Sequence, residues 1–249
     1  MAVSWRSPTS ASSSSVPTRS RGYPAAMGGG HAALRTSTVI EDYLVTIYRL
    51  AVGGDAVLGA RLAEQLAVSP ASVTEMVGRL RQQGLLEPGR RIVLSPAGLA
   101  MARTLVTRHR LAERFLVDVL GFGWEEVHDE AHRLEHAFSP LVTERLADFL
   151  GHPATCPHGH PIMEDDAAEP ELNLRPLTTL TDGTTATVRR IAIEDTPLLA
   201  MLRSLGIGLG TRVRMLGGET DDERLRLEVE GHPRLIQRSA AGTVLVEEG

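Results

Sequence analysis

Four side chains that can bind a metal ion lie within nine residues of this sequence. They are His128, His132, Glu135 and His136. Because each residue of an α-helix turns by about 100°, these side chains would share a sector of about 100° on one helix face. Imidazole and carboxylate groups are suitable ligands for a divalent first-row metal. The spacing predicts a metal site on a helix, with a solvated polar stripe on a surface helix as the alternative.

A second pair with the same chemistry lies upstream. His109 and Glu113 are separated by four residues, so they also share a helix face. Two such clusters in one region favour metal binding over a polar stripe. The stretch from His132 to His136 also fits H-x-x-E-H, a zinc metallopeptidase pattern in which two His bind zinc and the Glu activates water. A peptidase is therefore an alternative function, and a structural protein with an adventitious His patch is another.

The composition is that of a globular protein. A length of 249 residues allows one large domain or two or three small ones, and 42% hydrophobic residues allow a core. The net charge of −5 does not by itself suggest a nucleic-acid binder. The single cysteine, Cys156, excludes an internal disulfide. It lies with His158 in Cys-Pro-His-Gly-His and could bind metal, but a lone cysteine in a Pro/Gly-rich linker is more typical of a structural residue. No apolar run of about 18 residues predicts a membrane span, and we expect a cytoplasmic protein.

The first half of the chain has the periodicity of helices. Residues 1–35 are rich in Ser, Pro, Gly and Arg and are predicted to form a disordered tail. Ser-Pro pairs at Ser69, Ser95 and Ser139 are typical helix starts, with Ser as the N-cap and Pro in the first turn. Within residues 85–94, two short extended runs flank the turn dipeptide Pro88-Gly89 and predict a small β-hairpin. The predicted helices cover about 37–52, 58–67, 70–83, 96–120, 124–138 and 140–150.

The last part of the chain has the alternation of strands. Residues 151–175 lack periodicity and are predicted to form a linker. Beyond them, β-branched and alternating apolar residues predict a small β-barrel of about 75 residues. A short helix at 197–205 interrupts strands at 185–193, 212–216, 224–229 and 242–247.

Three helices followed by a hairpin form the pattern of a winged helix-turn-helix domain, with an ordinary three-helix bundle that carries a hairpin as the alternative. The start of the third helix would enter the major groove of double-stranded DNA. There, small Ala and Ser side chains allow close approach and contact with thymine methyl groups. The predicted base-facing residues are Ser69, Ala71, Ser72, Thr74 and Glu75, and the predicted phosphate contacts are Arg79, Arg81, Arg90 and Arg91. Residues 69–91 carry four Arg and two Glu, a net charge of only +2. This weak basicity favours a switched binder over a constitutive one.

Taken together, these segments resemble the diphtheria-toxin-repressor family of metal-dependent regulators (DtxR, MntR and IdeR-like). The resemblance lies in EDYLVTIYRL (41–50), LAEQLAVSPASVTEMVGRL (62–80), RHRLAERFLVDVLG (108–121), VHDEAHRLEHAFS (127–139), CPHGHPI (156–162) and RSLGIGLGTRVRML (203–216). It implies a mostly α fold with a small β domain. The expected parts are a tail (1–35), a winged helix-turn-helix domain (36–98), a helical metal-binding and dimerisation domain (99–155), a linker (156–175) and an SH3-like or FeoA-like domain (176–249).

The resemblance also implies two metal sites. The first would use Asp42 on the first helix together with His132, Glu135 and His136. The second would use His109, Glu113 and His128, with Asp195 or Glu194 from the SH3-like domain as a loosely aligned partner. Iron-type members of the family have Met and Cys in place of Asp42 and His132, and manganese-type members have Asp and often Glu. Val45 stands where the binuclear manganese subgroup has a Glu.

A ligand set of nitrogen and oxygen atoms indicates which metal to expect. Mn(II) is favoured, Fe(II) is second and Zn(II) is third. The resemblance implies a homodimeric repressor of metal-homeostasis genes that is not an enzyme. A metal joining Asp42 to the second cluster would tie the DNA-reading helices to the dimer core and shift the population toward the DNA-binding form.

Overall fold

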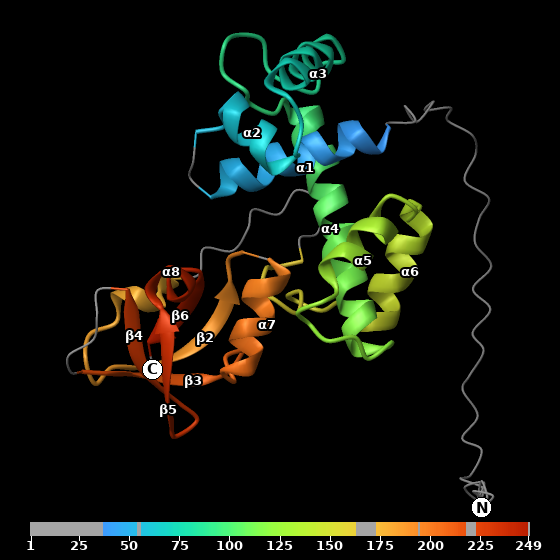
Figure 1. Cartoon of the computed structure of the whole chain (residues 1–249). Coiled ribbons are helices and arrows are strands. Elements are labelled where there is room, and N and C mark those ends of the chain that lie inside the picture. The colour runs from blue at the N-terminus through green and yellow to red at the C-terminus, as the bar shows by residue number, and fades with distance from the viewer. Residues whose placement is uncertain (1–36, 54–55, 163–172, 194, 218–222, 249) are drawn as a thin grey trace, which may run out of the picture. The chain divides into compact units, whose positions relative to one another are not determined.

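The computed structural model of the chain describes residues 37–53, 56–162, 173–193, 195–217 and 223–248 (Figure 1), and the tail predicted at 1–35 lies outside them. None of the helices in these ranges is long and apolar enough to cross a bilayer. In chain order the elements are α1 (Thr38–Val52), α2 (Gly59–Gln65), α3 (Pro70–Gln82), α4 (Pro96–Asp118), α5 (His128–Glu135), α6 (Pro140–Leu150), β1 (Arg175–Pro176), a short 3-10 turn (Leu177–Thr179), β2 (Thr185–Ile191), α7 (Thr196–Ser204), β3 (Arg212–Leu216), β4 (Arg224–Val229), β5 (His232–Gln237), α8 (Arg238–Ala241) and β6 (Val244–Glu248).

The N-terminal helices form a winged helix-turn-helix domain, which confirms the predicted fold. The apolar faces of α1, α2 and α3 enclose one core with the start of α4, including Leu44, Ile47, Leu62 and Leu80. Burial of these faces removes apolar area from water, which is the main favourable term in folding. The helix starts follow local chemistry, since the Ser69, Ser95 and Ser139 side chains each accept a hydrogen bond from a backbone N–H in the first turn of α3, α4 and α6.

The predicted hairpin is a short wing between α3 and α4. Leu86 and Leu94 form an isolated antiparallel bridge. Gly98 of α4 lies so close that a Cβ atom there would be 2.0 Å from the Leu85 carbonyl oxygen. Glycine therefore lets the base of the wing pack directly on α4.

Helix α4 is shared by two cores, and α5 is shorter than expected. Ala102 and Leu105 belong to the core of the winged helix domain, whereas Ala112 and Leu116 pack with Val127 and with Ala131 of α5. The prediction that a helix begins near residue 124 is wrong, because α5 starts at His128. The segment before it turns at Gly123, whose N–H donates to Glu126, and Trp124 packs against the core of the C-terminal domain.

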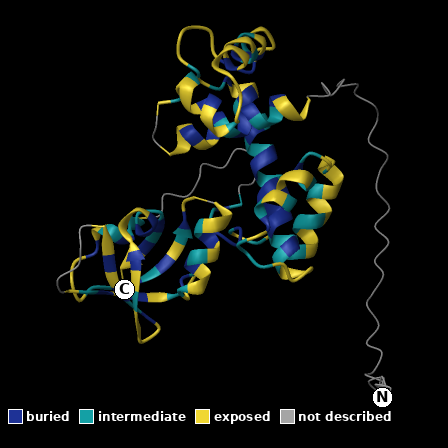
Figure 2. Ribbon diagram, viewed as in Figure 1, coloured by how far each residue is buried: buried dark blue, intermediate teal, exposed yellow. Residues whose placement is uncertain are grey.

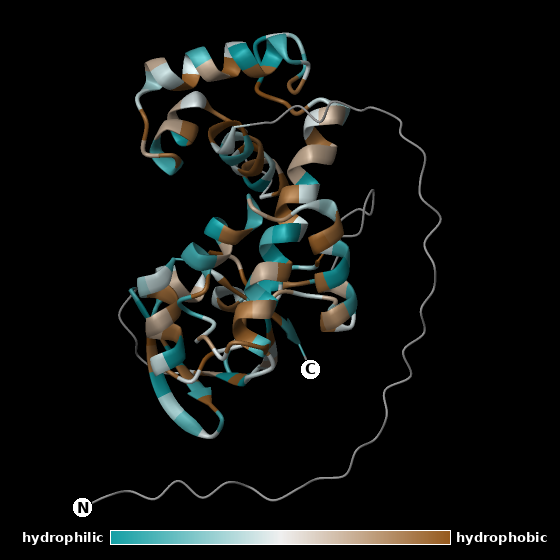
Figure 3. Ribbon diagram, turned by 90° about the vertical axis from the view of Figure 1, so that its right-hand side faces the viewer, coloured by the Kyte–Doolittle hydropathy of each residue, from teal (hydrophilic) through white to brown (hydrophobic). Residues whose placement is uncertain are grey.

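The C-terminal domain contains a six-stranded antiparallel sheet in the order β1-β6-β2-β3-β4-β5. Exposed and buried residues alternate along β3 and β4, and polar and apolar bands alternate along the strands in Figure 3. Strand β5 and helix α8 are absent from the predicted elements. Strand β5 begins His232-Pro233-Arg234 and has only its Ile236 side chain in the core, so its sequence lacks the usual alternation.

Candidate metal centre and DNA-binding surface

Two groups of potential metal ligands come together in the helical region. The first, which we call the interhelix cluster, joins α1 to α5 and consists of Asp42, His132, Glu135 and His136. One ligand atom from each of these residues lies within 4.8 Å of all the others. Asp42 Oδ1 is 3.3 Å from His136 Nε2 and 3.7 Å from His132 Nε2. The structure thus brings together the four residues that the family resemblance assigned to the first site.

Burial differs sharply within the interhelix cluster. The His132 side chain is 50% exposed, whereas that of Glu135 is 2% exposed. Burial alone would raise the pKa of Glu135, but hydrogen bonds from His109 and His132 outweigh it and lower that pKa to about 2. Burial raises the pKa of Asp42 despite the nearby imidazoles. The hydrogen bond to Glu135 is the main cause of a raised pKa for His132. Two carboxylates with opposite shifts therefore face the same small space.

Glu41, a residue absent from the predicted site, also contacts this cluster. His136 Nδ1 donates a hydrogen bond of 2.6 Å to Glu41 Oε2. The other ring nitrogen, Nε2, then faces Asp42 and Glu135, at 3.3 and 3.4 Å. A carboxylate behind a metal-binding histidine fixes the ring and its tautomer. Nothing in the spacing indicates a role for Glu41, and Asp42, the other acidic residue of α1, was assigned from the family resemblance.

The second group, the buried cluster, consists of His109, Glu113, His128, Cys156 and His158. Glu113 is fully buried and belongs to two overlapping ligand sets, one with His109 and His128 and one with Cys156 and His158. Its Oε1 atom is 3.3 Å from His109 Nε2, 3.9 Å from His128 Nδ1 and 3.3 Å from His158 Nδ1. The structure thus places the 156–158 segment, predicted as the start of a linker, at the second site.

The charges of the buried cluster stabilise one another. Burial opposes ionisation of Glu113, but the histidines around it lower its pKa well below the ordinary range. Burial also opposes a charge on His109, yet Glu113 and Glu135 together raise its pKa. The loop that carries His158 is held against β2, because the Ile191 N–H donates to the His158 carbonyl oxygen. Gly159 permits this approach, since it has φ +87° and a Cβ there would lie 2.1 Å from the Arg189 carbonyl oxygen.

Several ligand atoms in both clusters are buried without a hydrogen bond. Asp42 Oδ1, His136 Nε2 and both carboxylate oxygens of Glu113 are in this state within the described residues. Such atoms are costly unless a partner satisfies them. Their convergence within a few ångströms fits a divalent cation in each cluster, which would supply the missing partner.

Asp195 lies elsewhere among the described residues. Its carboxylate is exposed and caps α7 by accepting a hydrogen bond from the Leu198 N–H at 3.0 Å. It belongs to neither cluster. Glu194, the other residue proposed from the SH3-like domain, lies outside the described residues.

The start of α3 presents the predicted DNA-reading side chains to solvent. Ser69, Ala71, Ser72, Thr74, Glu75, Arg79, Arg90 and Arg91 are all exposed. Some are also engaged locally, since the Ser72 N–H donates to Ser69 Oγ and Thr74 Oγ1 donates to the Pro70 carbonyl. Arg81 is half-buried and donates to the Arg91 carbonyl at 3.2 Å, so it ties α3 to the wing.

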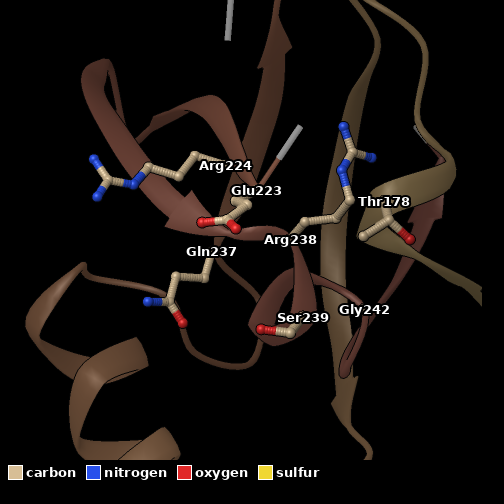
Figure 4. A pocket seen from close by; sticks show the side chains of 7 residues that line it. All are labelled: Thr178, Glu223, Arg224, Gln237, Arg238, Ser239 and Gly242. Atoms are coloured by element: carbon tan, nitrogen blue, oxygen red, sulfur yellow. The ribbon is translucent and has the colours of Figure 1, made fainter. Parts of the chain in front are cut away.

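A polar pocket of about 810 Å³ lies in the C-terminal domain (Figure 4). It is lined by Thr178, Glu223, Arg224, Gln237, Arg238, Ser239 and Gly242. None of these residues belongs to either ligand cluster. This pocket therefore has no part in the metal centre.

Comparison with known families supports this arrangement in three consecutive segments. Residues 35–90 match the N-terminal DNA-binding domain of iron-dependent repressors. Residues 95–164 match the metal-binding and dimerisation domain of the same repressors, and residues 175–248 match the FeoA domain. No comparison supports the metallopeptidase interpretation. The buried Glu135 is held by two histidines, unlike a general base that faces a substrate water.

Individual relatives extend over most of the chain. The chain is 40% identical to the iron-dependent repressor IdeR of Mycobacterium leprae, over 70% of this chain and 81% of that protein. It is 36% identical to the diphtheria toxin repressor of Corynebacterium efficiens, over 71% of this chain and 82% of that protein.

Two solved structures share this fold over most of the chain. A manganese-dependent transcriptional repressor in complex with manganese is 35% identical with a TM-score of 0.77, covering 84% of this chain and all of that one. ScaR with bound Zn²⁺ is 32% identical with a TM-score of 0.72, covering 84% and 99% of the two chains. The fold, the clustered ligands and these similarities together show that the chain belongs to the diphtheria-toxin-repressor family of metal-dependent transcriptional repressors.

Proposed function

We propose that Mn(II) bound by the interhelix cluster is the co-repressor that puts this chain into its DNA-binding form. The observation that carries the proposal is the position of Asp42. This residue lies on α1, the first helix of the DNA-binding domain, with its carboxylate within 3.3 Å of His136 just after α5. A metal held by both would join α1 to α5 across more than 90 residues of sequence.

Physical chemistry favours a switch at this position. Without a cation, the two carboxylates of Asp42 and Glu135 share a partly buried space, where burial raises the pKa of Asp42. A divalent cation cancels that charge and satisfies the buried ligand atoms. Any ligand that binds one conformation better than another shifts the population toward it. The metal would thus stabilise the arrangement of α1 that suits DNA binding.

The choice of metal follows from the ligand atoms. The interhelix cluster offers carboxylate oxygens and imidazole nitrogens without thioether or thiolate, which suits Mn(II) and then Fe(II). Zn(II) remains a competitor because it binds imidazole tightly. Relatives are named for both iron and manganese dependence. The buried cluster includes the Cys156 sulfur and therefore suits a softer ion better than the interhelix cluster does.

The proposed partners are double-stranded DNA and a second copy of the chain. The exposed start of α3 would read the major groove, and Arg90 and Arg91 of the wing would contact phosphates. Helix α6 has no buried residue, as Figure 2 shows, and Leu141 and Phe149 are 61% and 68% exposed. A second copy would cover this apolar face, and the matched family model is a dimerisation domain. Such a repressor would act in the cytoplasm.

The test is fluorescence anisotropy with labelled DNA from the region upstream of the protein's own coding sequence. We expect binding with Mn(II) or anaerobic Fe(II) and none with chelator. His136→Ala should abolish the metal response, whereas His152→Ala, a control at an exposed histidine paired with Asp148, should leave it unchanged. Binding that ignores the metal, or a His136→Ala protein that responds normally, would refute the proposal.

A further inference from the structure

The side of α3 that faces away from its core carries a carboxylate between two very small residues. The buried side chains of this helix lie along one side and are Val73, Val77 and Leu80. At about 100° per residue, Ala71, Glu75 and Gly78 lie on the opposite side, each about one helical turn from the next. Ala71 and Glu75 are exposed, and Gly78 is half-buried. The Glu75 side chain therefore projects from this side between two residues that have little or no side chain.

Gly78 has no packing reason, within the described part of the chain, to be glycine. A Cβ atom built there would have no atom within 4 Å, whereas one at Gly98 would lie 2.0 Å from the Leu85 carbonyl oxygen. Glycine inside a helix loses more conformational freedom on folding than alanine does, so it destabilises the helix. The missing side chain therefore fits the close approach of a surface that does not belong to the folded domain.

The Glu75 carboxylate is available for a hydrogen bond from such a surface. The hydroxyl groups of Ser69 and Ser72 are already paired at 2.8 Å, and the Thr74 hydroxyl donates to the Pro70 carbonyl. Among the described residues, Glu75 has no hydrogen bond or ion pair. Phosphates repel a carboxylate on a DNA-binding surface, so this side chain weakens binding unless a base donates a hydrogen bond to it.

We propose that Glu75 reads a cytosine in each half-site of the DNA operator, and that Gly78 lets α3 lie close enough to the bases for this contact. The inference rests on the proposed function, because it assumes that α3 enters the major groove. In that groove only cytosine and adenine present an amino group, whereas guanine and thymine present acceptors that repel a carboxylate. Adenine also presents its N7 lone pair beside the amino group, so cytosine is the better partner for a carboxylate.

Selection from a library of double-stranded DNA with a randomised core tests this proposal, with the full-length chain and Mn(II). The wild type should enrich a cytosine at one position of each half-site. Glu75→Gln should change that preference to adenine, whose N6 and N7 match an amide, and Glu75→Ala should remove it. Glu64→Gln removes one negative charge from an exposed position of α2 and is the matched control, which should keep the cytosine.

Fluorescence anisotropy on the enriched sequence measures the size of the effect. Replacing the selected C·G pair by T·A in one half-site should weaken wild-type binding by about tenfold or more, as one mismatched pair usually does. The same replacement should weaken binding by Glu75→Ala by less than about twofold.

Gly78→Ala tests the close approach separately from folding. It should weaken binding to every DNA sequence by about tenfold, comparable to the loss of one base contact. It should also raise the unfolding temperature, because alanine favours the helix, and leave the Mn(II) affinity unchanged. A variant that is more stable and yet binds DNA less tightly shows that glycine serves the contact with DNA and not the fold.

Each part of the proposal has its own contrary result. Equal base preferences for the wild type and Glu75→Ala would overturn the reading of cytosine by Glu75. Wild-type DNA affinity in Gly78→Ala would overturn the role of Gly78. A library that yields no enriched sequence with Mn(II) or anaerobic Fe(II) would refute the proposed function itself, and with it the basis of this inference, which is a distinct result.

Discussion

The interhelix cluster and the buried cluster use the same kinds of side chain in opposite settings. The interhelix cluster joins helices far apart in sequence, and its His132 is half exposed. The buried cluster is organised around Glu113, which is fully buried, and around a loop held by backbone hydrogen bonds. The first arrangement suits an ion that comes and goes and changes which segments are joined. The second suits an ion or a charge network that supports the fold.

The ligand atoms sharpen this difference. The interhelix cluster has oxygen and nitrogen donors only among its described members, whereas the buried cluster adds the sulfur of Cys156. A thiolate favours softer metals such as Zn(II). Two clusters in one protein can therefore differ in metal preference, and only the more exposed one needs to respond to a changing supply.

The largest expected effect separates the two clusters by their role in stability. Glu113→Ala should destabilise the metal-free chain by about 3 kcal/mol, the low end for breaking a buried pair, because His109, His128 and His158 lose the carboxylate that they share. Asp42→Ala should change metal-free stability by less than about 1 kcal/mol, since that carboxylate is partly exposed. Urea unfolding in chelator measures both. Equal effects would mean that the clusters do not differ in this way.

The next effect concerns metal preference in the interhelix cluster. Asp42→Met combined with His132→Cys would give the ligand types of the iron-type relatives. We expect the preference to move from Mn(II) toward softer ions by about tenfold or more in a competition titration. Cys156→Ala should leave the Mn(II) affinity of this cluster nearly unchanged. A double variant that keeps the wild-type preference would show that geometry, and not donor softness, sets selectivity.

Spacing predicts which ligands share a helix face, but not which helices meet. His132, Glu135 and His136 could be grouped from their spacing, as could His109 and Glu113, because a helix has a fixed period. The same spacing also groups His128 with His132, whereas the structure places His128 beside Glu113 in the buried cluster. Asp42 was reached through the family resemblance alone, since no local rule brings residues about 90 positions apart together. Cys156 and His158 lie in a segment without periodicity, so the spacing reveals nothing about their position. The one local signal there is Gly159, which allows the tight turn that buries them.

Fold prediction succeeded where local sequence signals agree with tertiary packing, and it failed where only tertiary contacts define an element. Helices α1, α3 and α4 have long apolar faces, and α3 and α4 also have Ser-Pro caps, so their local signals agree with their tertiary packing. Strand β5 has weak alternation and is held by its pairing with β4, a contact that only the folded sheet provides. The start of α5 was misplaced because Trp124 packs against another domain instead of continuing the helix.

A smaller effect is expected at Glu41, which positions a ligand of the interhelix cluster without being one of its four residues. Glu41→Gln weakens the acceptor for His136 Nδ1 and should lower Mn(II) affinity of that cluster by about tenfold, as for other partners of metal-binding histidines. The circular dichroism spectrum of Glu41→Gln should match that of the wild type, because the fold should not change. Glu64→Gln, at an exposed residue of α2, is the matched control. An affinity equal to that of the control would assign Glu41 a purely structural contact.

The smallest expected effect concerns stability. Within the interhelix cluster, the ionised carboxylates of Glu135 and Asp42 contribute to the stability of the metal-free fold with opposite signs. The lowered pKa of Glu135, about 2, means that this group stabilises the metal-free fold above pH 4.5 and that the contribution is lost as the pH falls toward 2. The raised pKa of Asp42 means the opposite. Its ionised form opposes folding at neutral pH, and protonation on acidification relieves this cost.

Asp42→Asn should therefore raise the urea midpoint of the metal-free chain at pH 7. The gain in unfolding free energy should be less than about 1 kcal/mol because the group is partly exposed, and it should vanish near pH 3. Glu135→Gln should lower the midpoint at pH 7. Saturating Mn(II) should reverse the sign for Asp42→Asn, because the wild type then gains stability from a ligand that the variant binds poorly. If Asp42→Asn lowers the midpoint in chelator, the ionised carboxylate of Asp42 does not destabilise the metal-free fold. Metal binding would then relieve no electrostatic cost in the metal-free protein, and the proposed switch depends on that relief.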